Sequence, residues 1–147
     1  MKTHEQRDTG GAADPEQTEA IVATMPFVGV LGARILMAEP AEVRARLAWD
    51  ASRCTTGGAL HGGALMALAD TTGGLCAFMN LPEGATGTTT IESKTNFLRT
   101  VRQGHVDAIS VPLHAGRTMI VIETDLLNAE GRRVAKALQS QAVLRPS

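Results

Sequence analysis

Two kinds of pattern divide this chain: short stretches in which apolar and polar residues alternate, and one long stretch that is apolar almost throughout. The alternation is clear in residues 43–49, where Arg44 and Arg46 separate apolar residues. This period of two is typical of a half-buried strand, with the two arginines on a solvated face. With the apolar run before Pro40, residues 30–49 therefore predict two strands joined by a turn.

The long apolar stretch covers residues 61–80 and is rich in Ala, Leu and Met. It is too long for a strand, and its composition favours a helix. Because it is apolar nearly all round, we expect this helix to be buried. Gly73 and Gly74 each weaken such a helix by about 1 kcal/mol relative to Ala, which indicates the close approach of another backbone.

The rest of the chain predicts one further helix and four further strands. Asp14-Pro15-Glu16 is a typical helix start, and Met25-Pro26 ends that helix after about Thr24. The strand-like segments are residues 88–98, 105–113, 118–127 and 132–144, with a hairpin turn at 128–131. This order of elements predicts an α+β fold in which an antiparallel sheet wraps the long helix.

Composition narrows the class of protein. A chain of 147 residues suits one domain, here residues 14–147 after a mobile tail of residues 1–13. A net charge of −1 and 3% aromatic residues argue against nucleic-acid binding. The apolar stretch is interrupted too early to span a membrane, and the N-terminus lacks a signal-peptide core. Two cysteines give neither a disulfide framework nor a zinc pattern, so we expect a soluble, cytoplasmic protein.

The chemistry centres on Asp70, a lone carboxylate in the apolar stretch, and on the glycines at its start. The charged form of a carboxylate in apolar surroundings is disfavoured unless hydrogen bonds satisfy it, which makes Asp70 a candidate base or nucleophile. The amides of Gly62 and Gly63 fall at a helix N-terminus, where they lack intrahelical partners and can donate to an oxyanion. A base and an oxyanion donor are the minimum for acyl transfer to water.

One helix cannot bring His61 and Asp70 together. Nine residues separate them by half a turn and by roughly 13 Å along the axis. Two antiparallel copies of the helix, related by a two-fold axis, would instead place Asp70 of one chain near Gly62 of the other. The spacing therefore predicts an isologous dimer with two equal sites.

Beyond these patterns, residues 27–144 resemble the hotdog-fold acyl-CoA thioesterases of the phenylacetate-degradation (PaaI-like) type. The resemblance is carried by HGGALMALADTTGG, TTTIESKTNFLRTVRQG, HAGRT and NAEGRRVAKA. It implies an antiparallel sheet around a central helix and sites between subunits of a homodimer or homotetramer. It also implies an acyl-CoA substrate, no metal, and no cofactor apart from the coenzyme A of the substrate and product.

The resemblance also assigns roles to single residues. Asp70 matches the acid that activates water or attacks the thioester, and Gly62 matches the glycine whose amide polarises the carbonyl. His61 would order the loop or contact the carbonyl side, and Thr90 would help hold the water near the acid. Thr55 stands where the family often has an asparagine, and a hydroxyl has a shorter reach than that amide.

Further candidates concern the binding of substrate and coenzyme A. They are Gly63, Arg99 and the turn Gly116-Arg117-Thr118. Arginine binds phosphate with two donors at once, although exposed loop arginines can equally be bystanders. The small apolar residues allow either an aryl-acetyl or a medium-chain acyl group.

Other functions fit the sequence less well. A non-catalytic acyl-CoA-binding module is the main alternative, since Thr55 departs from the thioesterase pattern. A hotdog hydratase would place a histidine base in a differently patterned motif. Cys54 and His61 lack an orienting group for nucleophilic catalysis, and His105 and His114 have no metal-ligand spacing.

Overall fold

The alternating stretches form six strands of one antiparallel sheet in the computed structural model, which describes residues 11–147. The strands are β1 (Arg34–Glu39), β2 (Glu42–Ala48), β3 (Gly87–Phe97), β4 (His105–Ala115), β5 (Met119–Asn128) and β6 (Arg133–Leu144). Their order across the sheet is β1-β2-β4-β5-β6-β3, so β1 and β3 lie at the edges. The predicted tail of residues 1–13 lies outside the described residues except for residues 11–13, which have no regular structure.

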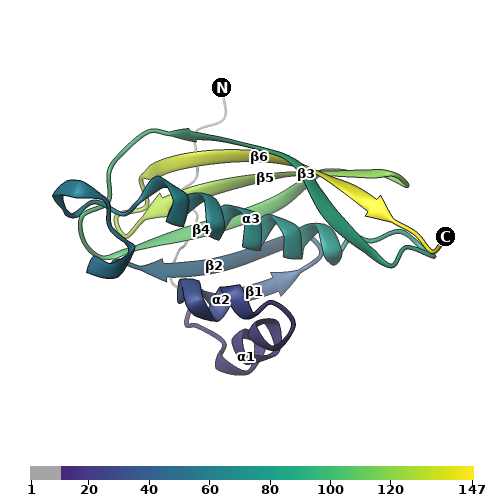
Figure 1. The fold of residues 1–147 in the computed structure, drawn as a ribbon, viewed down its shortest axis with the longest axis horizontal. Coiled ribbons are helices and arrows are strands. Elements are labelled where there is room, and N and C mark those ends of the chain that lie inside the picture. The colour runs from purple at the N-terminus through teal and green to yellow at the C-terminus, as the bar shows by residue number, and fades with distance from the viewer. Residues whose placement is uncertain (1–10) are drawn as a thin grey trace.

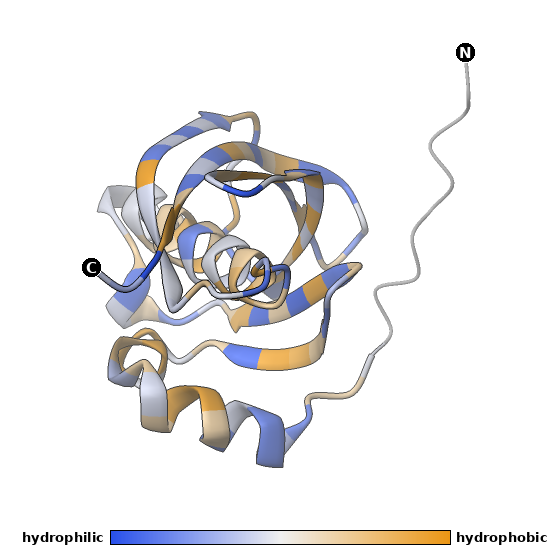
Figure 2. Ribbon diagram, turned by 90° about the vertical axis from the view of Figure 1, so that its right-hand side faces the viewer, coloured by the Kyte–Doolittle hydropathy of each residue, from blue (hydrophilic) through white to orange (hydrophobic). Residues whose placement is uncertain are grey.

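The long apolar stretch forms helix α3 (Gly62–Phe78), around which the sheet curls (Figures 1 and 2). Its buried residues, including Leu65, Leu68 and Cys76, join inward-facing strand residues such as Leu47 and Ile122 in the core. This arrangement confirms the predicted α+β class and the hotdog fold. None of the helices in residues 11–147 is long and apolar enough to cross a membrane.

The expectation that α3 is buried all round is wrong for a single chain. One stripe of the helix stays open, and its members are four residues apart: Met66, Asp70, Gly74 and Phe78. Residues with this spacing share one face of a helix. The sheet covers the opposite face, so the apolar residues of the open stripe have no cover within this chain.

The close approach of another backbone, predicted for Gly73 and Gly74, is not seen within residues 11–147, where a side chain is the nearest neighbour of Gly73. A Cβ atom on Gly73 would lie 2.3 Å from Oε1 of Gln139, so a side chain of β6 occupies that space. A Cβ atom on Gly74 would meet nothing within 4 Å. The two adjacent glycines therefore differ in what occupies the space beside them, which is a side chain at Gly73 and open space at Gly74.

Two helices precede the sheet. In α1 (Pro15–Thr24), the predicted cap is confirmed, since Asp14 Oδ1 accepts a 2.9 Å hydrogen bond from the Gln17 amide. The sequence analysis missed α2 (Pro26–Leu31), because Pro26 begins a new helix as well as ending the first. Val28 and Leu31 of α2 are buried in the core that includes α3. The loop before α3 contains two short 3₁₀ turns, η1 (Ala51–Arg53) and η2 (Thr56–Gly58).

The outer face of the sheet is more ordered than the predicted solvated face. Arg46 Nε and Nη2 donate to the two carboxylate oxygens of Asp107 at 2.7 and 2.8 Å. Asp107 is only 2% exposed, and its hydrogen bond raises the pKa of Arg46. A bidentate pair between β2 and β4 thus supplies a full positive charge to a carboxylate that is almost completely buried.

The two cysteines should differ in their reactivity toward thiol reagents. Burial, and to a lesser extent the charge of Glu42, raises the pKa of Cys76 to about 11. Because the thiolate is the reactive form, a raised pKa leaves very little of it at pH 8. We expect one equivalent of thiol per native chain, from the half-buried Cys54, and a second only after denaturation in urea. Two fast equivalents in the native protein would contradict this burial of Cys76.

Candidate active site

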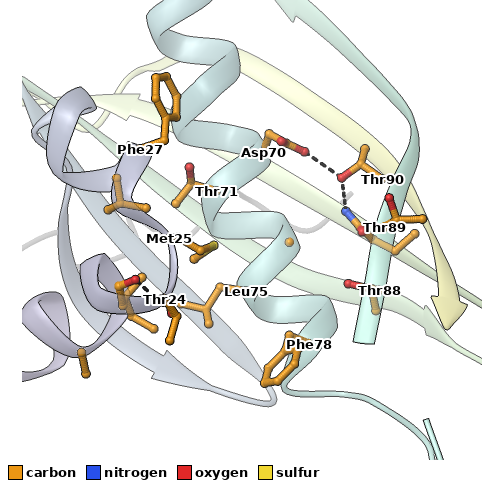
Figure 3. A pocket seen from close by; sticks show the side chains of 15 residues that line it. Thr24, Met25, Phe27, Asp70, Thr71, Leu75, Phe78, Thr88, Thr89 and Thr90 are labelled. Carbon is orange, nitrogen blue, oxygen red and sulfur yellow. Dashed lines mark hydrogen bonds between the residues drawn. The ribbon is translucent and has the colours of Figure 1, made fainter. Parts of the chain in front are cut away.

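Asp70 projects from the middle of α3 toward β3 and is hydrogen-bonded there to Thr90 (Figure 3). A second hydrogen bond to its carboxylate comes from Gln139 of β6. Thr90 Oγ1 donates to Oδ1 over 2.9 Å, and Gln139 Nε2 donates to the same oxygen over 3.3 Å. Within residues 11–147, Oδ2 accepts no hydrogen bond. The structure therefore brings the predicted pair Asp70 and Thr90 together and leaves one carboxylate oxygen free to act.

The direction of the Thr90 hydrogen bond is set from β6. Gln141 Nε2 donates to Thr90 Oγ1 over 2.7 Å, so the single hydroxyl hydrogen of Thr90 points at Asp70. Thr90 and Gln141 are paired across β3 and β6, and the register shifts immediately after Thr90. Such an irregularity re-aims a side chain relative to the regular ladder.

Gln139 and Gln141, each of which is 1% exposed, were not predicted as site residues. A signal was available in the period of two along the last predicted strand. Residues 135, 137, 139 and 141 share one face of β6, and Ala135 and Ala137 mark that face as the buried one. Two amides on a face otherwise built from alanine point to a polar partner inside.

His61 begins α3 as its N-cap, because its Nδ1 atom accepts a 2.8 Å hydrogen bond from the Gly63 amide. A ring nitrogen that accepts is unprotonated, so the proton of the neutral ring is on Nε2. Of the two amides predicted as oxyanion donors, Gly63 is thus already paired. The Gly62 amide has no hydrogen-bond partner among the described residues.

Gly62 also lies close to the side chain of Phe97. A Cβ atom at this position would lie 3.1 Å from the ring of Phe97 at the end of β3. Thr55 lies in the loop that precedes this helix start, where its side chain is exposed and its amide donates to the Ala59 carbonyl. The candidates therefore form two groups, one at the start of α3 and one around Asp70, about 12 Å apart along the helix axis.

The candidates for binding coenzyme A lie at opposite ends of the sheet. Arg99 Nη1 donates to the Arg133 carbonyl at the start of β6, whereas the Thr118 carbonyl accepts from the Val143 amide near its end. The ten residues of strand between them span about 30 Å. Arg117 is exposed next to Thr118, and a Cβ atom on Gly116 would lie 3.0 Å from the Met119 carbonyl oxygen. Arg99 and Arg117 of one chain therefore cannot contact the same phosphate.

A groove of about 730 Å³ opens beside Asp70. Helices α1 and α2 form one wall, α3 forms the floor, and Thr88, Thr89 and Thr90 of β3 form the other wall (Figure 3). A smaller cavity of about 380 Å³ lies near His61 and Cys54. The Cys54 thiol donates to the Asp50 carbonyl at 3.3 Å, so the structure shows no cysteine–histidine pair.

Residues 57–135 match the sequence model of the thioesterase superfamily. The chain belongs to this superfamily. The matched region contains the helix start at His61 and Gly62 as well as Asp70 and Thr90, whereas α1, α2, Gln139 and Gln141 lie outside it.

Individual proteins are also similar to this chain. A putative esterase of Saccharolobus solfataricus is 39% identical over 89 residues, which cover 60% of this chain and 62% of that protein. The 1,4-dihydroxy-2-naphthoyl-CoA hydrolase of Escherichia coli is 30% identical over 87 residues, which cover 59% and 63%. The chain thus matches about three fifths of the length of these curated relatives.

Solved structures extend the similarity to nearly the whole chain. A mutant thioesterase of Pseudomonas aeruginosa superposes with a TM-score of 0.81 and 28% identity, covering 94% of this chain and 96% of that one. The fold and the superfamily are therefore established. The narrower phenylacetate-degradation type stays a prediction.

Proposed function

We propose that this protein hydrolyses an acyl-CoA thioester to a free acid and coenzyme A. The observation that carries the proposal is the state of the Asp70 carboxylate. Thr90 and Gln139 fix one of its oxygens, the other oxygen is free, and a groove of about 730 Å³ begins beside it. Membership of the thioesterase superfamily supports the reaction type.

Two routes use this geometry. In the first, Oδ2 of Asp70 takes a proton from water, and the oxygen of that water attacks the thioester carbonyl. In the second, Oδ2 itself attacks, and water then hydrolyses the resulting anhydride. In both routes the oxyanion of the tetrahedral intermediate accepts a hydrogen bond from the N–H group of Gly62. The carbon–sulfur bond then breaks and releases the thiolate of coenzyme A.

The proposed site needs two copies of the chain. Antiparallel α3 helices that place Asp70 opposite Gly62 of the partner subunit would bring residue 66 to the two-fold axis, since 66 lies midway between 62 and 70. Met66 is a member of the open stripe and is 41% exposed in the single chain. The apolar, uncovered position at the expected axis supports the proposed dimer.

The edge strand β3 offers a second argument for the dimer. It has 11 residues, and among the described residues it pairs only with β6. Ile91 in its middle is 60% exposed. A long edge strand with unpaired backbone groups is a template for pairing with another chain, and pairing two copies of β3 would join their sheets beside both sites.

A site made from two copies also changes the role open to the arginines. In each shared site, the subunit that provides Gly62 would also provide Arg99, and the subunit that provides Asp70 would also provide Arg117. Both therefore stay proposed contacts for the phosphates of coenzyme A, together with the turn at Gly116 and Thr118. A homotetramer built from two such dimers is compatible with the same site.

A non-catalytic acyl-CoA-binding module is the second candidate, favoured by Thr55 in place of an asparagine. The deciding experiment is release of coenzyme A, followed with a thiol reagent, across short, medium, long and aryl acyl-CoAs. Multiple turnovers support the hydrolase. Stoichiometric binding measured by calorimetry, without thiol release above the protein's own cysteines, would replace it with the binding module.

Gly73→Ala should weaken the support of Asp70. The new methyl group would occupy the place of the Gln139 amide, which is buried and must give up its hydrogen bond to Asp70 to move. Overpacking typically costs about 1–3 kcal/mol, against a gain of about 1 kcal/mol from replacing a helical glycine. Gly74→Ala, the stability control, should keep the whole gain because its methyl group meets open space.

Thermal unfolding of both variants and the kinetics of thiol release check this prediction. We expect a lower midpoint for Gly73→Ala than for Gly74→Ala, and for Gly73→Ala a lower kcat with little change in KM. Equal midpoints for the two variants, with kcat unchanged in Gly73→Ala, would show that Gln139 does not position the carboxylate.

A further inference from the structure

The geometry points to a substrate class: we propose that the groove over α3 holds the acyl group, and that it takes bulky, uncharged, apolar acyl groups because Gly74 keeps it open. This inference rests on the proposed thioesterase function and deepens it. The acyl group would extend from Asp70 along the open stripe of α3 toward Phe78, between α1–α2 on one side and β3 on the other (Figure 3).

The first argument is the charge of the lining. Asp70 is the sole charged side chain among the described residues that line the groove, and the others are apolar or carry hydroxyl or amide groups. An acyl group ending in a carboxylate would enter beside a like charge without a cation to pair with it. Burial of an unpaired charge is costly, so the groove discriminates against dicarboxylic acyl groups.

The second argument is size. A cavity of about 150 Å³ is enough for benzene, and the groove of about 730 Å³ is several times larger. Asp70 and Phe78 both line it and are eight residues apart on α3, which corresponds to about 12 Å along the helix axis. An acetyl group would leave most of the apolar surface of the groove exposed to water, whereas a medium-length chain or a fused ring system would cover it.

The third argument is Gly74 itself. A glycine inside a helix costs about 1 kcal/mol relative to Ala, and the fold gives no reason for it here. Its backbone is not in the left-handed region, and a Cβ atom would meet nothing within 4 Å. Gly73, by contrast, makes room for Gln139. Since Gly74 lines the groove one turn after Asp70, the space that it leaves belongs to the ligand.

Gly74→Leu tests this proposal because leucine is a good helix former and fills the groove. The matching change on the wall formed by α1 and α2 is Ala20→Leu, since Ala20 also lines the groove. Ala23→Leu is its control, since Ala23 is exposed on the same helix and does not line the groove. The readouts are kcat/KM for decanoyl-, propionyl- and succinyl-CoA, and Kd for the same compounds in the Asp70→Asn background.

We expect the wild type to prefer decanoyl-CoA to propionyl-CoA and to discriminate against succinyl-CoA. Gly74→Leu and Ala20→Leu should lower the decanoyl-to-propionyl ratio of kcat/KM at least tenfold, with the thermal midpoint kept or raised in Gly74→Leu. Ala23→Leu should leave that ratio within twofold of wild type. Equal losses for all three compounds would overturn the proposal, because the groove would then hold the part of the substrate common to them.

Binding separates this proposal from the reaction itself. If no thioester is cleaved, the hydrolase fails, but a Kd for decanoyl-CoA that weakens at least tenfold in Gly74→Leu still supports the acyl groove. If thioesters are cleaved with no dependence of kcat/KM or Kd on acyl length, the groove proposal fails while the hydrolase stands.

Discussion

Asp70→Asn should lower kcat for thiol release by about 10²–10⁴-fold, the range expected for loss of a positioned base, without loss of the fold. An asparagine oxygen can still accept the hydrogen bond from Thr90, so the local geometry survives. Asp70 is exposed in the single chain, and the uncharged amide adds no burial cost there. What disappears is the carboxylate oxygen that takes a proton from water or attacks the thioester.

The comparison requires a carboxylate that lies away from the site. Glu130 is exposed in the turn between β5 and β6, so Glu130→Gln removes one negative charge without touching α3 or the groove. Thiol release by Glu130→Gln should equal that of wild type, and circular dichroism should be the same for all three proteins. Full turnover by Asp70→Asn would exclude both proposed routes.

Gly62→Pro should lower kcat by about 10²–10³-fold, the usual cost of one oxyanion donor. Proline is well accepted at the first position of a helix, where the amide has no helical partner, so the substitution removes the N–H group and keeps the helix start. Gly62→Ala is the matched control. Both variants place a Cβ atom about 3.1 Å from the Phe97 ring, but alanine retains the amide. Equal kinetics for the two variants would exclude the Gly62 amide as a donor.

The same variants test whether a site is shared between subunits. In a mixed dimer of Asp70→Asn and Gly62→Pro chains, one site has both defects and the other has neither. Half of the dimers in a random mixture are mixed and have one intact site of two, so about a quarter of wild-type activity should return. The mixture is made by refolding the two chains together, with each chain refolded alone as the control. No recovery would show that Asp70 and Gly62 of the same chain act together.

Most of the fold could be predicted from the sequence because its patterns are local. Alternation in some segments, and strand-like length and composition in the others, located all six strands, and the composition of residues 61–80 located α3. The second helix at Pro26 was missed because proline both ends one helix and begins another. The full burial of α3 was wrongly expected, since apolar composition alone does not show that the sheet covers only part of a helix.

The sequence could predict several individual residues of the site, but it could not predict the hydrogen bonds that join them. The motif pointed to Asp70, Gly62 and Thr90, and in the structure the Thr90 hydroxyl donates a hydrogen bond to the Asp70 carboxylate. The period of two places Gln139 and Gln141 on the buried face of their strand, but their partners lie 69 and 51 residues away in the chain, so no local pattern connects them with Asp70 and Thr90. His61 was open to two roles until the geometry showed its ring capping the helix.

Helices α1 and α2 lie before the region matched by the family, yet they supply one wall of the groove, while Asp70, Gly62 and the Gly74 floor of the groove lie within that region. One wall of the proposed acyl groove is thus encoded apart from the reacting groups. Substitutions in α1 and α2 could alter which acyl group fits while the carboxylate and its supports stay unchanged. This separation makes α1–α2 the natural part to exchange in an engineered chimera.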